Sequence, residues 1–466
     1  EYVQEFAAAE WSTLDLVAGL APTLAHAMFR QACGLEPHPR HQAIRGWLRA
    51  NAGQISPLLN ADLAGRGVTV LDLGVGSDDL ADGVWERPGA VRAHIARALK
   101  ERGEGLGLGR HAEARLSYTR YDSPVEPETI HLGVELFVPA ETAVFAPLDG
   151  AVARLGWNEL IVRHEPAAGC AFYTRYAGLA PADLLAVGAR VQRGEVLGRV
   201  AAADVGAPLP PHLHFQLACD LPGDLPALAA GSERAVWLSI CPDPNLILNF
   251  PNLQPAQDWP PTDTLLARRR AAQAQSQETY YRHPMQIVRG WRQYLIDDAG
   301  RAYLDAINNV AHVGHGHPRV VAAARRQMAR LNTNNRFVYA NLVEFSERLK
   351  ALLPDTLSVV FLVNSGSEAN DLALRLARTY TGSEHVLTID GAYHGNTTAV
   401  YEVSTSILDN PTAAKAVKPY VHPVIQPNTF RGPHGADDPH AGLKYAAAVE
   451  TAVAQLQSVG QRPAAF

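Results

Sequence analysis

The chain has 466 residues, of which 47% are hydrophobic and 19% are charged, and its formal net charge at pH 7 is -6. This length suits about three domains, each able to bury a core. An acidic balance without a basic run gives no reason to expect nucleic acid, and no apolar run is long enough to cross a bilayer, so neither a nucleic-acid nor a membrane partner is predicted.

The cysteines and the start of the chain indicate a cellular compartment. Cys33, Cys170, Cys219 and Cys241 are scattered without CxxC spacing, which is typical of reduced thiols rather than of a disulfide framework or a zinc knuckle. The chain begins with Glu1 and shows no basic-then-apolar leader. We therefore expect a cytoplasmic protein whose reading frame begins upstream of Glu1.

Residues 1–117 are predicted to form a helical leader and connecting region. Ser12 or Thr13 can cap a first helix, a second follows Pro22, and a third covers residues 41–52. The segment faintly resembles the tail of aminoglycoside-phosphotransferase-like kinases, but it carries none of that family's catalytic motifs. A helical packing region is the simpler interpretation.

Two glycine-containing stretches lie within this leader. Residues 68–77, Val-Thr-Val-Leu-Asp-Leu-Gly-Val-Gly-Ser, resemble the first motif of nucleoside-dependent methyltransferases. Asp78 replaces the third glycine of that motif and no helix pattern follows at once, so a plain buried strand is preferred. Residues 103–109 miss the GxGxxG spacing and are predicted to be a loop or a strand edge.

From residue 118 to residue 250 the pattern changes to short alternating segments punctuated by Pro and Gly, which predicts an all-β module. Two histidines of this module, His212 and His214, are two residues apart on one strand and therefore face the same side. The module contains four phrases in this order: residues 131–135, 139–150, 187–195 and 212–215.

The histidines and the glutamate in these segments are residues that can bind a metal ion. With His131 and Glu135, the His212–His214 strand can supply two imidazoles and a carboxylate to Zn²⁺, leaving an open position for water. The four phrases together resemble the lysostaphin-type zinc endopeptidases. That resemblance implies that His131, Glu135 and His214 are the metal ligands. It also implies that His212 is one of two histidines that act on the scissile peptide bond.

Two departures from that family argue against hydrolysis. The family's carboxylate ligand is aspartate, whereas Glu135 is longer by one methylene. The second catalytic histidine lies in a Tyr-x-His-Leu phrase, which here reads Tyr-Ala-Gly-Leu at residues 176–179. A general acid or base contributes roughly two to four orders of magnitude in rate. His164, one strand earlier, can replace it only if the backbone differs.

We therefore predict a peptidase-like module that binds Zn²⁺ with moderate affinity at best. A zinc metallopeptidase of cell-wall peptide crosslinks and a non-catalytic scaffold are the alternatives. A lipoyl or biotinyl carrier is excluded, because no lysine lies between His131 and Asp220.

A proline-rich linker, residues 251–274, leads into an α/β domain at residues 275–466. Residues 359–363 form an apolar run of the kind buried in a parallel sheet, and residues 364–378 have helical periodicity. The turn between them, Ser365-Gly366-Ser367, offers backbone N–H groups, a helix N-terminus and hydroxyl donors to a phosphate.

Residues 385–389 predict a neighbouring strand that ends near Tyr393-His394-Gly395, where an aromatic ring can stack on a flat cofactor. With Tyr303-Leu304-Asp305 and residues 314–318, these motifs resemble the class III aminotransferases of pyridoxal phosphate fold type I. The resemblance implies that Gly366 and Ser367 hold the cofactor phosphate and Tyr393 stacks on its ring. Ser365 and His394 are further candidate cofactor-binding residues. A homodimer through this domain is expected.

The family's Schiff-base lysine and its pyridine-nitrogen acid are not assigned in this chain. Lys415, Lys418 and Lys444 are the only lysines after Tyr393, and their contexts indicate solvated surface residues. We therefore expect a truncated domain with half of an active site. His315 and His317 lie in a loop without a nearby acid, so no metal is assigned there.

Residues 307–315 and 333–337 look most like the ethanolamine-phosphate and phosphohydroxylysine phospho-lyases. The expected substrate is a small amine or amino-alcohol phosphate, and Arg336 is a candidate contact for its phosphate because a guanidinium fork suits phosphate oxygens. A structural ion pair of Arg336 is an equal alternative. ω-Transamination is the alternative reaction.

Overall fold

The computed structural model describes residues 22–466 except 61–66, 88, 102–104, 122, 183–184, 205–206, 251–258, 278, 280, 309–311 and 413–415. It divides into two compact units, Glu1–Leu331 and Asn332–Phe466. Among the described residues, no helix is both long and apolar enough to span a membrane. The helix expected after Ser12 or Thr13 lies outside the described residues.

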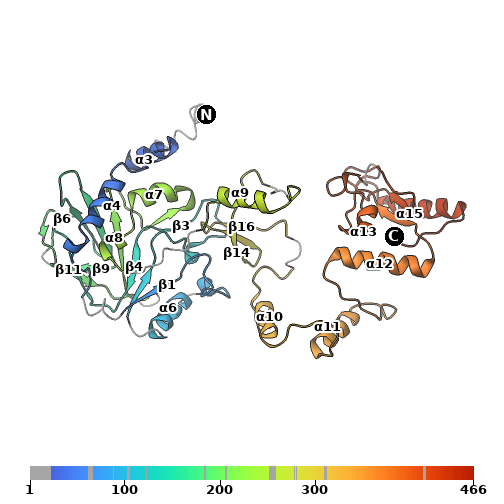
Figure 1. Ribbon diagram of the computed structural model, residues 1–466, viewed down its shortest axis with the longest axis horizontal. Helices are drawn as coiled ribbons and strands as arrows, with labels where there is room; N and C mark the ends of the chain where they lie inside the picture. Colours follow the sequence, from blue (N-terminus) through green and yellow to red (C-terminus); the bar gives the residue numbers. More distant parts are fainter. Residues whose placement is uncertain are drawn as a thin grey trace. The chain divides into compact units, whose positions relative to one another are not determined.

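The elements of the first unit are drawn from blue to yellow in Figure 1. Its helices are α3 (Pro22–Ala32), α4 (His41–Ala50), η1 (Ala52–Gln54), η2 (Val84–Glu86), α6 (Ala90–Glu101), η3 (Leu116–Tyr118), η4 (Gly231–Glu233), α7 (Arg234–Ile240), α8 (Asn245–Leu248), α9 (Thr262–Ala272) and α10 (Pro318–Arg330). Its strands are β1 (Val68–Leu71), β2 (Leu106–Gly109), β3 (Glu128–His131), β4 (Val134–Phe137), β5 (Ala143–Phe145), β6 (Gly150–Leu155), β7 (Glu159–His164), β8 (Phe172–Ala177), β9 (Leu179–Pro181), β10 (Arg190–Val191), β11 (Val196–Val200), β12 (His212–Ala218), β13 (Leu228–Ala230), β14 (Ile287–Trp291), β15 (Tyr294–Asp297) and β16 (Ala302–Leu304).

An eight-stranded sheet forms the centre of this unit, in the order β1-β2-β4-β12-β8-β7-β6-β10. Only β1 and β2 run parallel, and the other neighbours are antiparallel. The prediction that residues 118–250 are rich in β-strands is confirmed. However, β1 and β2 come from the segment predicted as a helical leader, so the sheet extends to the N-terminal side of residue 118.

β2 corrects the prediction that residues 103–109 are a loop or a strand edge. It lies inside the sheet, between β1 and β4, and the side chains of Leu106 and Leu108 are fully buried. The alternating glycines are needed because neighbours approach closely: a Cβ on Gly107 would lie 2.8 Å from Leu99 Cδ2. The predicted strand at residues 68–77 and the helix at residues 41–52 are confirmed by β1 and α4.

The antiparallel β14-β15-β16 sheet packs into the core of the same unit. Trp291 is 6% exposed, and its ring meets that of Trp85 edge-on with centroids 5.1 Å apart. Arg289 donates to the carbonyl oxygens of Val75, at 2.6 Å, and Ser77. The first strands of the predicted α/β domain are therefore part of the unit that contains the β-rich module.

The second unit is smaller. Its helices are α11 (Ala340–Lys350), α12 (Gly366–Thr381), α13 (Thr398–Val403) and α15 (Ala441–Ser458), and its strands are β17 (Val386–Ile389) and β18 (Val421–Val424). β17 and β18 are parallel, and Ala465 forms a parallel bridge to Val386. The predicted helix after Ser365 and the strand at residues 385–389 are confirmed.

The strand predicted at residues 359–363 is wrong. These residues form no strand, and Val359 and Phe361 are 75% and 61% exposed. An apolar run becomes a strand only where neighbouring strands supply hydrogen-bond partners. Within the described part of this unit, β17 and β18 pair with each other and not with this run.

Candidate functional site

Three strands of the large unit bring the predicted metal ligands together. His131 ends β3, Glu135 lies on β4, and His214 lies on β12 directly opposite Glu135. The three side chains are buried, at 1%, 3% and 6% exposure, and their nearest ligand atoms all lie within 4.8 Å of one another. Sequence reasoning thus identified residues that the fold assembles.

The hydrogen bonds of the two imidazoles determine which nitrogen faces inward. His131 Nδ1 lies 3.1 Å from the carbonyl oxygen of Arg110 and 3.3 Å from Arg115 Nη2. In the tautomer whose Nδ1 donates to the nearer carbonyl oxygen, Nε2 carries a lone pair. His214 Nε2 donates to Gln216 Oε1 at 3.3 Å, and the Gln216 amide is oriented by donating to the Pro226 carbonyl. His214 Nδ1 therefore also carries a lone pair.

The inward-facing nitrogens of His131 and His214 thus lie close to each other and to a carboxylate oxygen of Glu135. His131 Nε2 is 3.2 Å from His214 Nδ1 and 3.3 Å from Glu135 Oε1. A tetrahedral Zn²⁺ with bonds of about 2.0–2.1 Å requires ligand atoms roughly 3.3–3.4 Å apart. The outer nitrogens donate to oxygens, which is the usual second shell of a metal-bound histidine. The residues present therefore fit Zn²⁺.

The ionisation of the ligands agrees with this arrangement. Although burial raises it, the nearby guanidinium of Arg115 holds the pKa of Glu135 well below its usual value. Burial holds the pKa of His214 well below its usual value. The carboxylate is thus charged and the His214 imidazole neutral near pH 7, as metal ligation requires.

A chain of buried charges that the sequence did not reveal lies behind the ligands. Arg115, 2% exposed, donates from Nη1 to Glu135 Oε2 at 2.7 Å, and its Nε lies 2.7 Å from Glu113 Oε2. Arg110 then joins Glu113 to Asp72, at 2.7 and 2.6 Å. Arg110, Glu113 and Arg115 lie close together in the chain, and packing brings Asp72 and Glu135 to them from other segments.

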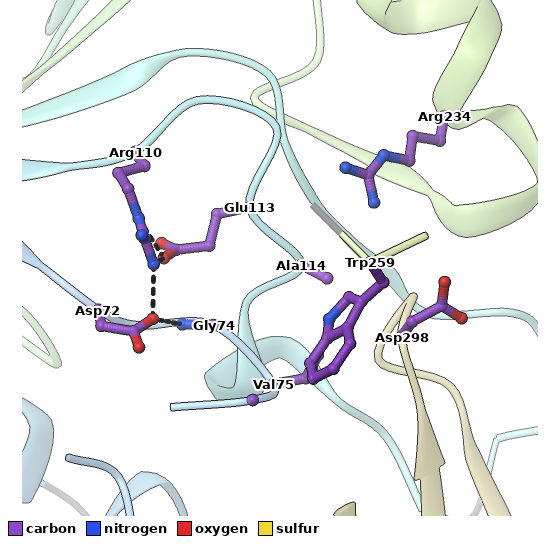
Figure 2. A pocket seen from close by; sticks show the side chains of 10 residues that line it. Asp72, Gly74, Val75, Arg110, Glu113, Ala114, Arg234, Trp259 and Asp298 are labelled. Carbon is purple, nitrogen blue, oxygen red and sulfur yellow. Dashed lines mark hydrogen bonds and ion pairs between the residues drawn. The ribbon is translucent and has the colours of Figure 1, made fainter. Parts of the chain in front are cut away.

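Figure 2 shows where this chain of charges reaches a small cavity. Arg110 points at Asp72 and Glu113, and Trp259 and Asp298 line the other side. The cavity volume is about 10 Å³, room for one water molecule at most. Asp72 is the acid of the methyltransferase-like phrase, and here it serves as an ion-pair partner.

His212, which was predicted to act on the scissile peptide bond, is only half buried. Its Nδ1 donates to the carbonyl oxygen of Pro210 at 2.8 Å. Gly178 takes the place of the family's second histidine with φ +78°, and a Cβ there would lie 2.6 Å from the His212 carbonyl oxygen. The buried His164 does not substitute, because its nitrogens contact the Asp149 carbonyl and Thr174 Oγ1, at 2.9 and 2.8 Å.

The predicted phosphate turn lies at the start of α12. Ser365 caps the helix by accepting from the Glu368 N–H at 3.2 Å, and Glu368 Oε2 accepts from the Asn364 N–H at 2.8 Å. The N–H groups of Gly366 and Ser367 have no partner within the helix. A Cβ on Gly366 would meet nothing within 4 Å, so no described atom crowds this side of the turn.

The turn that carries Tyr393 and His394 packs against this helix start. Asn396 donates to Ser367 Oγ at 3.1 Å, and a Cβ on Gly395 would lie only 2.5 Å from that oxygen. Tyr393 is 49% exposed. The His394 ring bonds Thr388 Oγ1 at 2.8 Å, which fixes the turn to β17.

Arg336 and the histidine loop complete the predicted residues. Arg336 is exposed, and its one described hydrogen bond runs from its backbone N–H to Asn334 Oδ1 at 3.0 Å. The expectation that His315 lacks an acid partner is wrong, because its Nε2 lies 2.6 Å from Asp305 Oδ2. The partner is ten residues away, and the Arg292–His315 bridge brings the loop back towards it.

Two segments of the chain, each containing one of these sites, match the models of two protein families. Residues 275–458 match the model of "Aminotransferase class-III", and residues 129–221 match that of "Peptidase family M23". The chain therefore contains one segment similar to each of these families. Neither match reaches the segment that resembles a kinase tail.

Among curated proteins, the chain is 43% identical over 218 residues to "Alanine--glyoxylate aminotransferase 2-like" of Drosophila melanogaster, covering 46% of this chain and 44% of the relative. It is 40% identical over 177 residues to "Ethanolamine-phosphate phospho-lyase homolog 1" of Caenorhabditis elegans, covering 38% of each. A solved phospholyase from Arthrobacter in complex with phosphoethanolamine is 38% identical, with a TM-score of 0.38, over 42% of this chain and 46% of that one. The chain spans less than half the length of each of these proteins.

Proposed function

We propose that residues 275–466 supply the phosphate-binding half of a pyridoxal-phosphate enzyme of the class III aminotransferase family. The observation that carries this proposal is the capped turn at Ser365–Ser367, with free N–H groups and the Tyr393 turn packed beside it. Gly366 and Ser367 would hold the phosphate, Tyr393 would stack on the ring, and His394 would hold the turn in place. The bound cofactor supplies an electron sink for the carbon beside the substrate amine.

The reaction we propose is removal of phosphate and ammonia from an amino-alcohol phosphate. Similarity to a phospho-lyase homologue over the matched segment supports it. Arg336 would bind the substrate phosphate through its planar fork. The phosphate leaves as a stable dianion, so elimination competes well with the reprotonation that transamination needs. ω-Transamination is the second candidate, supported by the similarity to alanine–glyoxylate aminotransferases.

Product analysis separates the two reactions. The full reading frame that contains this chain, saturated with pyridoxal phosphate, is incubated with O-phosphoethanolamine and no 2-oxo acid. We expect inorganic phosphate, ammonia and aldehyde in equal amounts, one water being consumed. Arg336→Met should raise KM for the phosphate ester, whereas Arg326→Met, which alters an exposed arginine of α10, should not. Strict dependence on a 2-oxo acid, with the ester left intact, would assign the protein to transamination.

The remaining expectations are proposals of the same account. We propose a homodimer through residues 275–466 and a cytoplasmic location, the latter supported by four cysteines that form no disulfide. For the peptidase-like unit we propose metal binding without hydrolysis, because Gly178 replaces an imidazole. Release of soluble muropeptides from peptidoglycan by the unaltered protein would instead establish a metallopeptidase.

A further inference from the structure

Arg115 is an unusual neighbour for a metal ligand. Its guanidinium is 2% exposed and contacts two carboxylates, Glu135 Oε2 and Glu113 Oε2, each at 2.7 Å. A buried charge persists only where opposite charges and hydrogen bonds compensate it. Because both contacts are short, the guanidinium is held in place by the fold and not by solvent.

The sheet leaves a space for this ion pair. Gly109 of β2 lies opposite Glu135, and a Cβ on it would lie 2.7 Å from Arg115 Nη2 and 2.9 Å from Glu135 Oε2. Any other residue at this position would therefore press on both charged groups. The glycine indicates that the pair is a built part of the site.

The two oxygens of Glu135 have different partners. Oε1 faces the two imidazoles and lies 3.3 Å from His131 Nε2, whereas Oε2 accepts a hydrogen bond from Arg115. Glu135 is the one anion of the ligand triad, since both imidazoles are neutral ligands. Arg115 therefore cancels the charge that would otherwise attract a metal most strongly.

We propose that Arg115 is a resident cation of the metal centre, which neutralises Glu135, keeps the ligands assembled without metal and weakens the binding of divalent metals. Two effects of Arg115 oppose each other. Loss of a second-shell contact typically weakens metal binding about 10–100-fold. Repulsion between two unit positive charges about 5 Å apart, at an effective dielectric constant near 20, weakens binding roughly a hundredfold or more. A divalent metal carries two charges, so the repulsive free energy doubles. The repulsion from Arg115 therefore outweighs its stabilising contact.

The test uses the full chain and measures Zn²⁺ affinity by competition with a chelator, and Tm with EDTA or with Zn²⁺. We expect EDTA to leave the wild-type Tm unchanged. Arg115→Met should bind Zn²⁺ at least tenfold more tightly, and Zn²⁺ should raise its Tm more than that of the wild type. The double variant with His214→Ala should lose this gain. Arg163→Met, which breaks an exposed pair with Glu165 on the same sheet, is the matched control and should behave as wild type.

Arg115→Lys distinguishes the effect of the positive charge from the effect of the guanidinium geometry. It also provides a test of the proposal if Arg115→Met does not fold. It keeps the positive charge, so the wild-type affinity should persist within about threefold. The proposal is overturned if Arg115→Met binds Zn²⁺ no more tightly than the wild type. It is also overturned if the Zn²⁺ affinity of Arg115→Lys is tenfold or more below that of the wild type, or if EDTA lowers the wild-type Tm substantially.

Discussion

Glu135 is one methylene longer than the aspartate of the family it resembles, and its surroundings use that length. One oxygen reaches the imidazoles and the other reaches Arg115, at 3.3 and 2.7 Å. A glutamate at this position thus bridges the metal side and the buried arginine. This departure from the family pattern is accommodated by a partner of Glu135 that lies twenty positions earlier in the chain.

Any side chain at position 178 is predicted to destabilise the fold. Gly178→Ala should lower the free energy of unfolding by about 3 kcal/mol or more, because it adds left-handed strain to a 2.6 Å clash with the His212 carbonyl oxygen. Gly169→Ala is the matched control: φ is +76° but nothing lies within 4 Å, so about 1 kcal/mol is expected. Urea unfolding measures both. Equal losses would show that the clash is relieved and that a histidine could be restored at residue 178.

His164 should make the first unit sensitive to acid. Burial lowers its pKa to about 4, from the usual 6.5. Between these values the unfolded chain binds a proton that the folded chain rejects, so stability is full above pH 6.5 and falls as pH decreases. The expected slope is about 1.4 kcal/mol per pH unit. Denaturation between pH 4 and 7 should show a smaller slope for His164→Gln, and equal slopes would contradict this assignment.

Among elements, the β14–β15 pair should stabilise the peptidase-like unit. Trp291→Ala is expected to cost about 3–5 kcal/mol, because Trp291 is 6% exposed and packs against Trp85. Trp157→Ala, at a residue 93% exposed, should change stability by less than about 0.5 kcal/mol. Thermal unfolding of the two variants tests this. A small effect of Trp291→Ala would mean that the strands are not needed by the unit.

The start of α12 should depend on its cap. Ser365→Ala removes the acceptor of the Glu368 N–H and should cost about 1 kcal/mol of local stability. Ser458→Ala, which removes a hydroxyl from the exposed end of α15, should be nearly neutral. Hydrogen exchange of the first amides of α12 reports the difference directly. Unchanged protection in Ser365→Ala would contradict the importance of this cap.

The elements that sequence predicted correctly are those set by local pattern. α12 follows from its cap and its apolar face, and β17 follows from a short apolar run before a glycine turn. The failures depend on neighbours. Residues 359–363 have the same apolar character as β17 but pair with no described strand, while the glycine-rich β2 is buried by strands on both sides.

The sites show the same limit. The resemblance of four segments to a zinc peptidase family identified His131, Glu135 and His214. The neighbouring strands β4 and β12 bring Glu135 and His214 together, and the end of β3 adds His131. Arg115, Glu113 and Arg110 lie outside those four segments, so only packing reveals them. Asp305 was missed as the partner of His315 for the same reason.

At the scale of the whole molecule, family boundaries and structural units do not coincide. The class III match begins at residue 275, yet the first compact unit extends to Leu331. Residues 275–331 are therefore similar in sequence to class III aminotransferases, but they lie in the compact unit that contains the predicted metal ligands. The predicted limits of 118–250 and 275–466 do not follow these units.

We propose that this chain provides the phosphate-binding turn of a pyridoxal phosphate site but not its covalent lysine. Lys418 and Lys444 have side chains 50% and 51% exposed and paired with Glu402 and Asp438, at 3.7 and 2.6 Å, while Lys415 lies outside the described residues. Both described lysines are therefore half exposed and paired with carboxylates on the surface.

Borohydride reduction of the chain with pyridoxal phosphate, followed by peptide mapping, tests this claim most directly. We expect weak cofactor binding and only low, scattered labelling of exposed lysines. A single stoichiometric pyridoxyl-lysine at Lys415, Lys418 or Lys444 would contradict the account, because the chain would then contain the complete cofactor site.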